Sequence, residues 1–113
     1  MRLRNSVAAA LGALTLVLTL PTSASAAIGN FDYTYFNEAG QPRIGGLIDP
    51  AGEECINVSG ATDEKPAQGP KNLTNATATV FLDFDCEGDT YYVMNPLKIL
   101  GPGLKFRSVA FSH

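Results

Sequence analysis

The sequence predicts an all-β protein, a small Greek-key β-sandwich closed by one disulfide. Three observations support this class. Beyond residue 26, apolar residues occur in short runs that alternate with polar residues and are separated by turn residues, a pattern typical of half-buried strands. No segment there combines a helical apolar period with helix start and stop signals. The chain has two cysteines, enough for a single bridge.

Residues 1–26 are predicted to be a secretory signal peptide. Arg2 and Arg4 form a short basic start, Val7–Leu20 is uncharged and almost wholly apolar, and Ala24-Ser25-Ala26 supplies the small residues before a cleavage site. The uncharged run is shorter than the ~20 residues that a membrane-spanning helix needs. We expect cleavage after Ala26, or one residue later, and one secreted, extracellular domain at residues 27–113 with no membrane attachment.

The charge of this domain argues against two classes of partner. Cleavage removes two of the eight basic residues and none of the eleven acidic ones, which leaves a formal net charge of −5. Nucleic acids and anionic lipids are bound mainly through Lys and Arg. We therefore expect neither a nucleic acid nor an anionic membrane surface as a partner.

The first half of the domain is predicted to form three strands. Phe31–Phe36 alternates aromatic and polar residues, and Asn37–Pro42 has the composition of a hairpin turn. A weaker strand is expected at Arg43–Ile48, interrupted by two glycines, and a short one at Cys55–Val58. The following stretch, Ser59–Asn75, has almost no apolar residues, and we expect an irregular loop of about 17 residues there, either mobile or functional.

The second half is predicted to contain three more strands. Ala78–Leu82 is the clearest, Asp83–Asp89 forms the turn after it, and Thr90–Met94 returns. Pro96–Gly103 is expected to be irregular, and Lys105–Phe111 to be the last strand.

Cys55 and Cys86 are predicted to bond to each other, because an exported chain with two cysteines most simply forms one disulfide. A free thiol pair and an intermolecular bridge are the alternatives. In a domain this small, a loop of about 30 residues closed by a disulfide stabilises the fold by roughly 3–4 kcal/mol.

The segment from Thr79 to Phe111 resembles a βγ-crystallin Greek-key motif. Phe81, Gly88 and Ser108 hold the positions of that motif's strand aromatic, its folded-hairpin glycine and the serine that fastens the hairpin. The resemblance extends to small secreted actinobacterial proteins, including metalloproteinase inhibitors with a crystallin-like fold. It implies that these three residues define the fold. In the first half, Tyr33 and Gly40 repeat the aromatic-to-glycine spacing.

We expect no metal or other cofactor. The calcium-binding crystallins carry two Asn or Asp residues before the serine, where this chain has Gly103 and Leu104. The acidic run Asp83–Asp89 begins like an EF-hand loop, but Met94 stands where the loop needs a bidentate Glu.

We also expect no catalysis. The only histidine, His113, is the last residue of the sequence, and the cysteines are predicted to be bonded, so no candidate nucleophile–base pair remains.

The function predicted from these observations is that of a secreted, non-catalytic binding module. Its sharpest version is a protease inhibitor that presents Ser59–Asn75 or Asn95–Gly103 to an extracellular protease. The alternative is a structural or cell-envelope-associated protein whose partner is an envelope component and not an enzyme.

Overall fold

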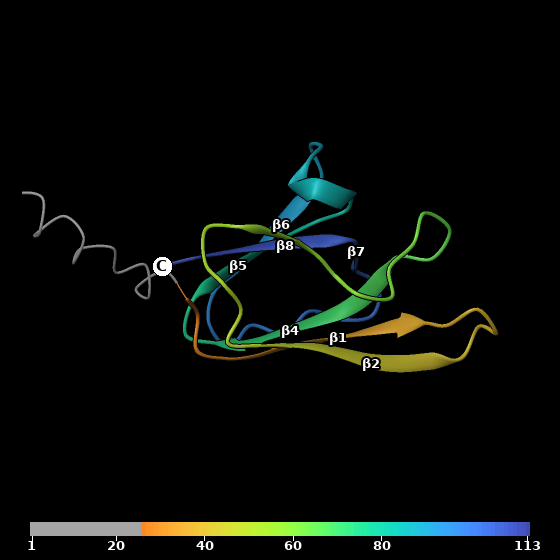
Figure 1. Ribbon diagram of the computed structural model, residues 1–113, viewed down its shortest axis with the longest axis horizontal. Coiled ribbons are helices and arrows are strands. Elements are labelled where there is room, and N and C mark those ends of the chain that lie inside the picture. Colours follow the sequence, from red (N-terminus) through yellow and green to blue (C-terminus); the bar gives the residue numbers. More distant parts are fainter. Residues whose placement is uncertain (1–25) are drawn as a thin grey trace, which may run out of the picture.

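The computed structural model describes residues 26–113, and residues 1–25 of the predicted signal peptide lie outside this range. The described chain forms two four-stranded antiparallel sheets that pack as two layers (Figure 1). The strands are β1 (Gly29–Phe36), β2 (Pro42–Ile48), β3 (Cys55–Asn57), β4 (Ala67–Thr74), β5 (Thr77–Phe81), β6 (Tyr91–Met94), β7 (Lys105–Phe106) and β8 (Ser108–Ser112). The prediction of an all-β sandwich is confirmed. One turn of 3₁₀ helix, Phe84–Cys86, follows β5.

Each half of the domain, β1–β4 or β5–β8, contributes one strand to the sheet that the other half mainly forms; we call this the strand exchange. The order is β2-β1-β4-β7 in the first sheet and β3-β8-β5-β6 in the second. Each sheet therefore takes three strands from one half of the domain and one from the other. β3 of the first half pairs with β8 of the second half, and β7 of the second half pairs with β4 of the first half.

The first hairpin contains a glycine pair that does not interrupt its strand. β2 runs unbroken from Pro42 to Ile48, and Gly45 lies opposite Tyr33 of β1. A Cβ atom at Gly45 would lie 2.5 Å from the Tyr33 ring, so only glycine lets the ring lie flat on the strand. The expected interruption at the two glycines is wrong, because the tyrosine ring fills the space that a larger side chain at Gly45 would occupy.

The stretch after Ser59 contains the main correction to the sequence-based prediction. Residues 67–74 are not a loop but β4, an interior strand of the first sheet between β1 and β7. Its buried positions are Ala67, Pro70, Asn72 and Thr74, so no apolar alternation marks it. Pro70 is tolerated there because the register with β1 shifts at this point, as at a β-bulge.

The predicted last strand is also divided. Lys105 and Phe106 pair with β4 in the first sheet, whereas Ser108–Ser112 pairs with β5 in the second. Arg107 is the single residue between them, so the chain crosses from one layer to the other there.

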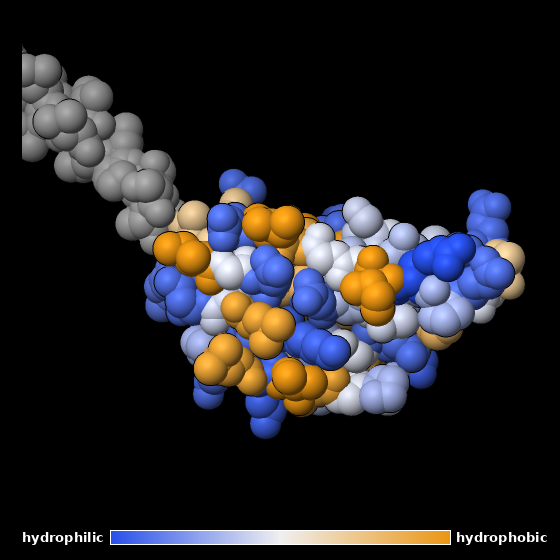
Figure 2. All heavy atoms as spheres, turned by 90° about the horizontal axis from the view of Figure 1, so that it is seen from below, coloured by the Kyte–Doolittle hydropathy of each residue, from blue (hydrophilic) through white to orange (hydrophobic). Residues whose placement is uncertain are grey.

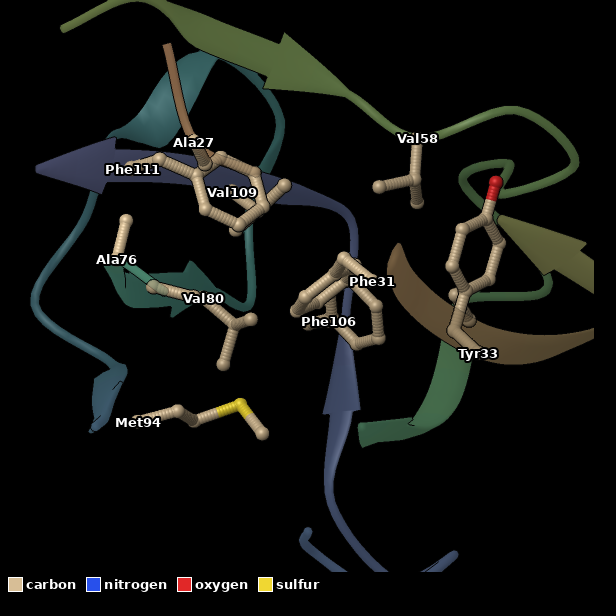
Figure 3. Close-up of a cluster of buried hydrophobic side chains, with 12 residues drawn as sticks. Ala27, Phe31, Tyr33, Val58, Ala76, Val80, Met94, Phe106, Val109 and Phe111 are labelled. Carbon is tan, nitrogen blue, oxygen red and sulfur yellow. The ribbon is translucent and has the colours of Figure 1, made fainter. Parts of the chain in front are cut away.

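Aromatic rings fill the space between the layers (Figure 3). Phe31 of β1 meets both Phe106 and Phe111 edge to face, with ring centroids 5.9 and 5.4 Å apart. Tyr33 packs edge-on against Phe106 at 5.8 Å, and its hydroxyl donates to the carbonyl of Ser59. Burial is the main factor that raises the pKa of Tyr33 above its ordinary value.

The three residues named from the crystallin resemblance lie around one folded hairpin. Gly88 has φ +89°, a left-handed conformation that glycine adopts cheaply. The fully buried Ser108 donates its hydroxyl proton to Asp83 O at 2.6 Å and accepts the N–H of Cys86 at 2.9 Å. Phe81, partly buried in β5, packs its ring against Tyr91.

The predicted disulfide is confirmed. Cys55 of β3 is bonded to Cys86 of the hairpin, with their Cα atoms 5.9 Å apart. Beside it, Asn57 exchanges two hydrogen bonds with Asp85, one donated by the asparagine amide and one by the Asp85 backbone N–H. These contacts tie the third strand of the first half to the hairpin of the second half.

Candidate binding surface

The two larger open clefts lie beside the β1–β2 hairpin and the turn after β5, and in each the basic side chain donates to backbone carbonyls of the protein itself. The larger, about 540 Å³, is walled by Tyr35 and Phe36 and includes Lys65. The Lys65 ammonium donates to the carbonyls of Asn37 and Glu38, so it ties the hairpin down and is not free for a ligand.

The second cleft, about 460 Å³, contains the acidic run predicted to be a turn. Its lining residues are Asp63, Asp83, Phe84, Asp85, Glu87 and Arg107. The Arg107 guanidinium donates to the carbonyls of Thr62, Asp63 and Leu82 and lies 6.0 Å from the centre of the Phe84 ring. The Arg107 guanidinium is thus held by backbone carbonyl oxygens on both sides of this cleft.

The expected absence of a metal site and of catalysis stays a prediction. Among residues 26–113, no group of three or more His, Cys, Asp or Glu side chains is arranged to hold a metal ion. His113 is exposed, and one of its ring nitrogens lies 3.0 Å from the carbonyl oxygen of Ala26. In the same part of the chain, no helix has the length and apolar character needed to cross a membrane.

The outer face of the first sheet carries a group of exposed aliphatic side chains. Phe31 and Tyr33 point into the core, so the alternate residues Asn30 and Asp32 point outward. Asn30 lies opposite Ile48 on one side and Leu73 on the other. Figure 2 views this face and shows apolar side chains gathered on it between polar ones.

We call Ile48, Leu73, Leu97 and Ile99 the aliphatic patch; all four are exposed. Ile99 joins the face because it forms a β-bridge with Lys71 of β4. Ile44 is exposed farther along β2, opposite Thr34.

Leu97 is the most unusual residue of the patch. Its φ is +70°, and its side chain is 73 % exposed. The Lys98 N–H donates to Asn95 O, which closes a turn with Pro96 and Leu97 at its centre. Proline followed by a positive φ is the pattern of a type II turn, in which the second central residue is normally glycine. We call Asn95–Lys98 the Leu97 turn.

The Leu97 turn is joined to β4 through a bulge. The N–H of Leu97 donates to Asn72 O, and the N–H of Asn72 donates to Lys98 O, so two residues of the turn oppose one residue of the strand. A left-handed residue at the first bulge position is again usually glycine. Leu97 therefore occupies a backbone position that disfavours it by roughly 1–2 kcal/mol, while its side chain faces solvent.

The side chain of Asn72 holds this region together from inside. It is fully buried, and its amide donates to the carbonyls of Ala76 and Met94 at 2.9 Å each. Its oxygen accepts from the hydroxyl of Thr74 at 2.7 Å. A third, longer contact of 3.3 Å reaches Asn95 O, the first residue of the Leu97 turn. Every polar atom of this buried amide has a partner, which fixes the turn relative to the sheet.

Of the two loops proposed from the sequence as binding segments, one contains a strand and the other does not. The second part of Ser59–Asn75 is strand β4, so residues 59–66 and Asn75 remain as connections. Asn95–Gly103 stays outside the named strands except for the Ile99 bridge, and it carries the exposed Leu97. Sequence reasoning missed Asn72 and Leu97 as individual residues. The available signal was the Asn-Pro-Leu-Lys order, in which proline marks the first central position of a turn.

Together the fold and surface define a small disulfide-bonded β-sandwich with a rigid aliphatic turn on one outer face. No family model matches the chain, and no curated protein or solved structure is significantly similar to it.

Proposed function

We propose that the protein is a secreted, non-catalytic binding module whose Leu97 turn inserts into an apolar pocket of a partner protein. The sharpest form of the proposal is an inhibitor of an extracellular protease, with Leu97 in the enzyme's primary specificity pocket. The observation that carries it is the exposed leucine at a backbone position suited to glycine.

The first support is energetic. A leucine that is 73 % exposed gains little from burial within its own fold, and its backbone conformation disfavours it. Glycine at this position would relieve the strain at little loss of packing. Strained residues of this kind cluster at binding and active sites. Binding of this side chain to a partner explains why the position holds leucine and not glycine.

The second support is rigidity. Association costs less free energy when the binding loop already has its bound conformation. The Leu97 turn is closed by its own Lys98-to-Asn95 bond and fastened to β4 through Asn72. A convex, pre-formed turn with one aliphatic side chain at its centre suits a pocket that accepts a single apolar residue.

The third support is the strand exchange. Each half of the domain contributes its third strand to the other sheet, so the two halves are arranged alike. This fits the crystallin resemblance, because a full crystallin domain has two such motifs. That resemblance includes metalloproteinase inhibitors, and fold analogy is a supporting argument only.

The test is inhibition of a panel of secreted proteases by residues 27–113. Enzymes with an apolar specificity pocket should be inhibited, and Leu97→Gly should weaken inhibition at least tenfold without destabilising the domain. Ile44→Gly is the matched control, because Ile44 is similarly exposed, at 76 %, on the same face but outside the turn. Equal inhibition by wild type and Leu97→Gly would refute the assignment to this turn.

Two other outcomes redirect the proposal. Inhibition confined to trypsin-like enzymes would point to Lys98 and not Leu97. No inhibition, with retention of the domain on purified cell wall, would favour the alternative role as a structural or envelope-associated protein.

A further inference from the structure

The outer edge of the second sheet, strand β6, is left open. β6 pairs with β5 in regular antiparallel register from Phe81–Tyr91 to Ala78–Met94, and within residues 26–113 no other strand covers its second side. All residues from Glu87 to Val93 are exposed. An edge strand presents unpaired N–H and C=O groups to which another extended strand can bond.

The other three sheet edges carry features that discourage such pairing. β2 contains Pro42, Arg43 and two glycines. β3 has three residues and begins at the disulfide, and β7 has only two residues. By contrast, β6 has the sequence Tyr-Tyr-Val-Met, with no charge, proline or glycine. It also has no bulge to turn it aside.

We propose that β6 pairs antiparallel with β6 of a second copy of the chain, so that the two second sheets join into one continuous sheet of eight strands. This inference does not rest on the proposed function, because the free edge of β6 can pair whether or not Leu97 binds a partner.

The side chains of β6 favour a second copy with a two-fold axis at Tyr92. Residues directly opposite across two strands point to the same face of a sheet. With the axis at Tyr92, each Tyr91 lies opposite Val93 of the other copy, and both are exposed on the outer face. Two aromatic–β-branched cross-strand pairs result, a favourable combination.

The neighbouring register is less favourable. An axis at Val93 would set the Tyr92 ring opposite Met94, whose side chain is fully buried in its own core, whereas the Tyr92 axis sets only the smaller Thr90 there and keeps both Tyr91–Val93 pairs. Charge also permits the Tyr92 register although the chain is acidic, because it sets Asp89 opposite Asn95 of the other copy and not opposite a second carboxylate.

A pairing through a strand of four residues forms few hydrogen bonds, so the dimer should be reversible. Sedimentation of residues 27–113 up to about 1 mM should show a dimer fraction that rises with concentration. Val93→Lys places a charge in the centre of the joint and should raise the dissociation constant at least tenfold. Ile44→Lys, at a similarly exposed site on the edge strand of the first sheet, should leave it unchanged.

The register has its own test. Tyr92→Cys should form an intermolecular disulfide faster than Val93→Cys under mild oxidation, because only residue 92 lies opposite itself. A protein that stays monomeric over the whole range would overturn the proposal, as would a dimer that tolerates Val93→Lys. A monomer that binds an unrelated extended peptide through β6 would show that the edge serves another partner, and it would also overturn the proposal.

Discussion

Asn72→Ala tests how strongly one buried amide stabilises the region around the Leu97 turn. The substitution removes the bonds to Ala76 O, Met94 O and the Thr74 hydroxyl, which are 2.7 to 2.9 Å long. The Thr74 hydroxyl lies 3.3 Å from Ala76 O and can turn toward it, so that pair finds a replacement. Met94 O and the buried Thr74 N–H, which donates to the Asn72 side-chain oxygen at 3.2 Å, then lose their hydrogen-bond partner at about 1–3 kcal/mol each. We expect a loss of about 3 kcal/mol.

In a domain of this size, that loss corresponds to a fall in the melting temperature of roughly 12–24 °C. Thermal and urea melts of the two proteins measure it directly. Asn75→Ala is the matched control, because Asn75 is exposed and its oxygen accepts a single N–H, that of Ile28, which water can replace. We expect that control to lose less than about 1 kcal/mol. If both variants lose the same small amount, the buried amide does not stabilise the region as argued.

Three further predictions concern the stability of the folded domain. Gly88→Ala and Ser108→Ala should each destabilise the domain by about 1–3 kcal/mol. The double variant should lose less than the sum of the two, because both changes act on Asp83 of the same hairpin. Denaturant melts that show additive, near-neutral effects would contradict this. Reduction of the Cys55–Cys86 bond should lower the melting temperature by several degrees or more, since a long loop is released; an unchanged melt would be inconsistent with that role. Because the raised pKa of Tyr33 favours the protonated hydroxyl in the folded state, its contribution to stability is complete below about pH 10 and is lost as the pH rises through the folded pKa. Melts between pH 9 and 11 should therefore show a shallower alkaline decline for Tyr33→Phe, and equal slopes would count against it.

The strands that could be predicted are those with an apolar inner face. β1 alternates Phe31 and Tyr33 with polar residues, and β5 buries Ala78 and Val80 in the same manner. The alternation rule detects such strands because it registers side chains that leave water.

β4 could not be predicted by that rule, because its inner face buries Asn72 and Thr74, which bond to each other and to the backbone. A polar pair that satisfies itself is buried at little cost but has the composition of a loop. The Leu97 turn escaped detection for a different reason. An exposed leucine in a loop is common, and only its backbone angle makes it unusual.

The strand exchange has a consequence for how the folded chain would respond to a cut in its backbone. A cut in the connection from Ser59 to Pro66 would separate β1, β2 and β3 from the other five strands in sequence. Neither piece could complete a sheet alone, since β3 lies against β8 and β4 lies between β1 and β7. The Cys55–Cys86 bond would also still join the two pieces covalently. A nicked molecule should therefore keep its shape and its exposed turn, and it should separate only after the disulfide is reduced and both sheets have opened together.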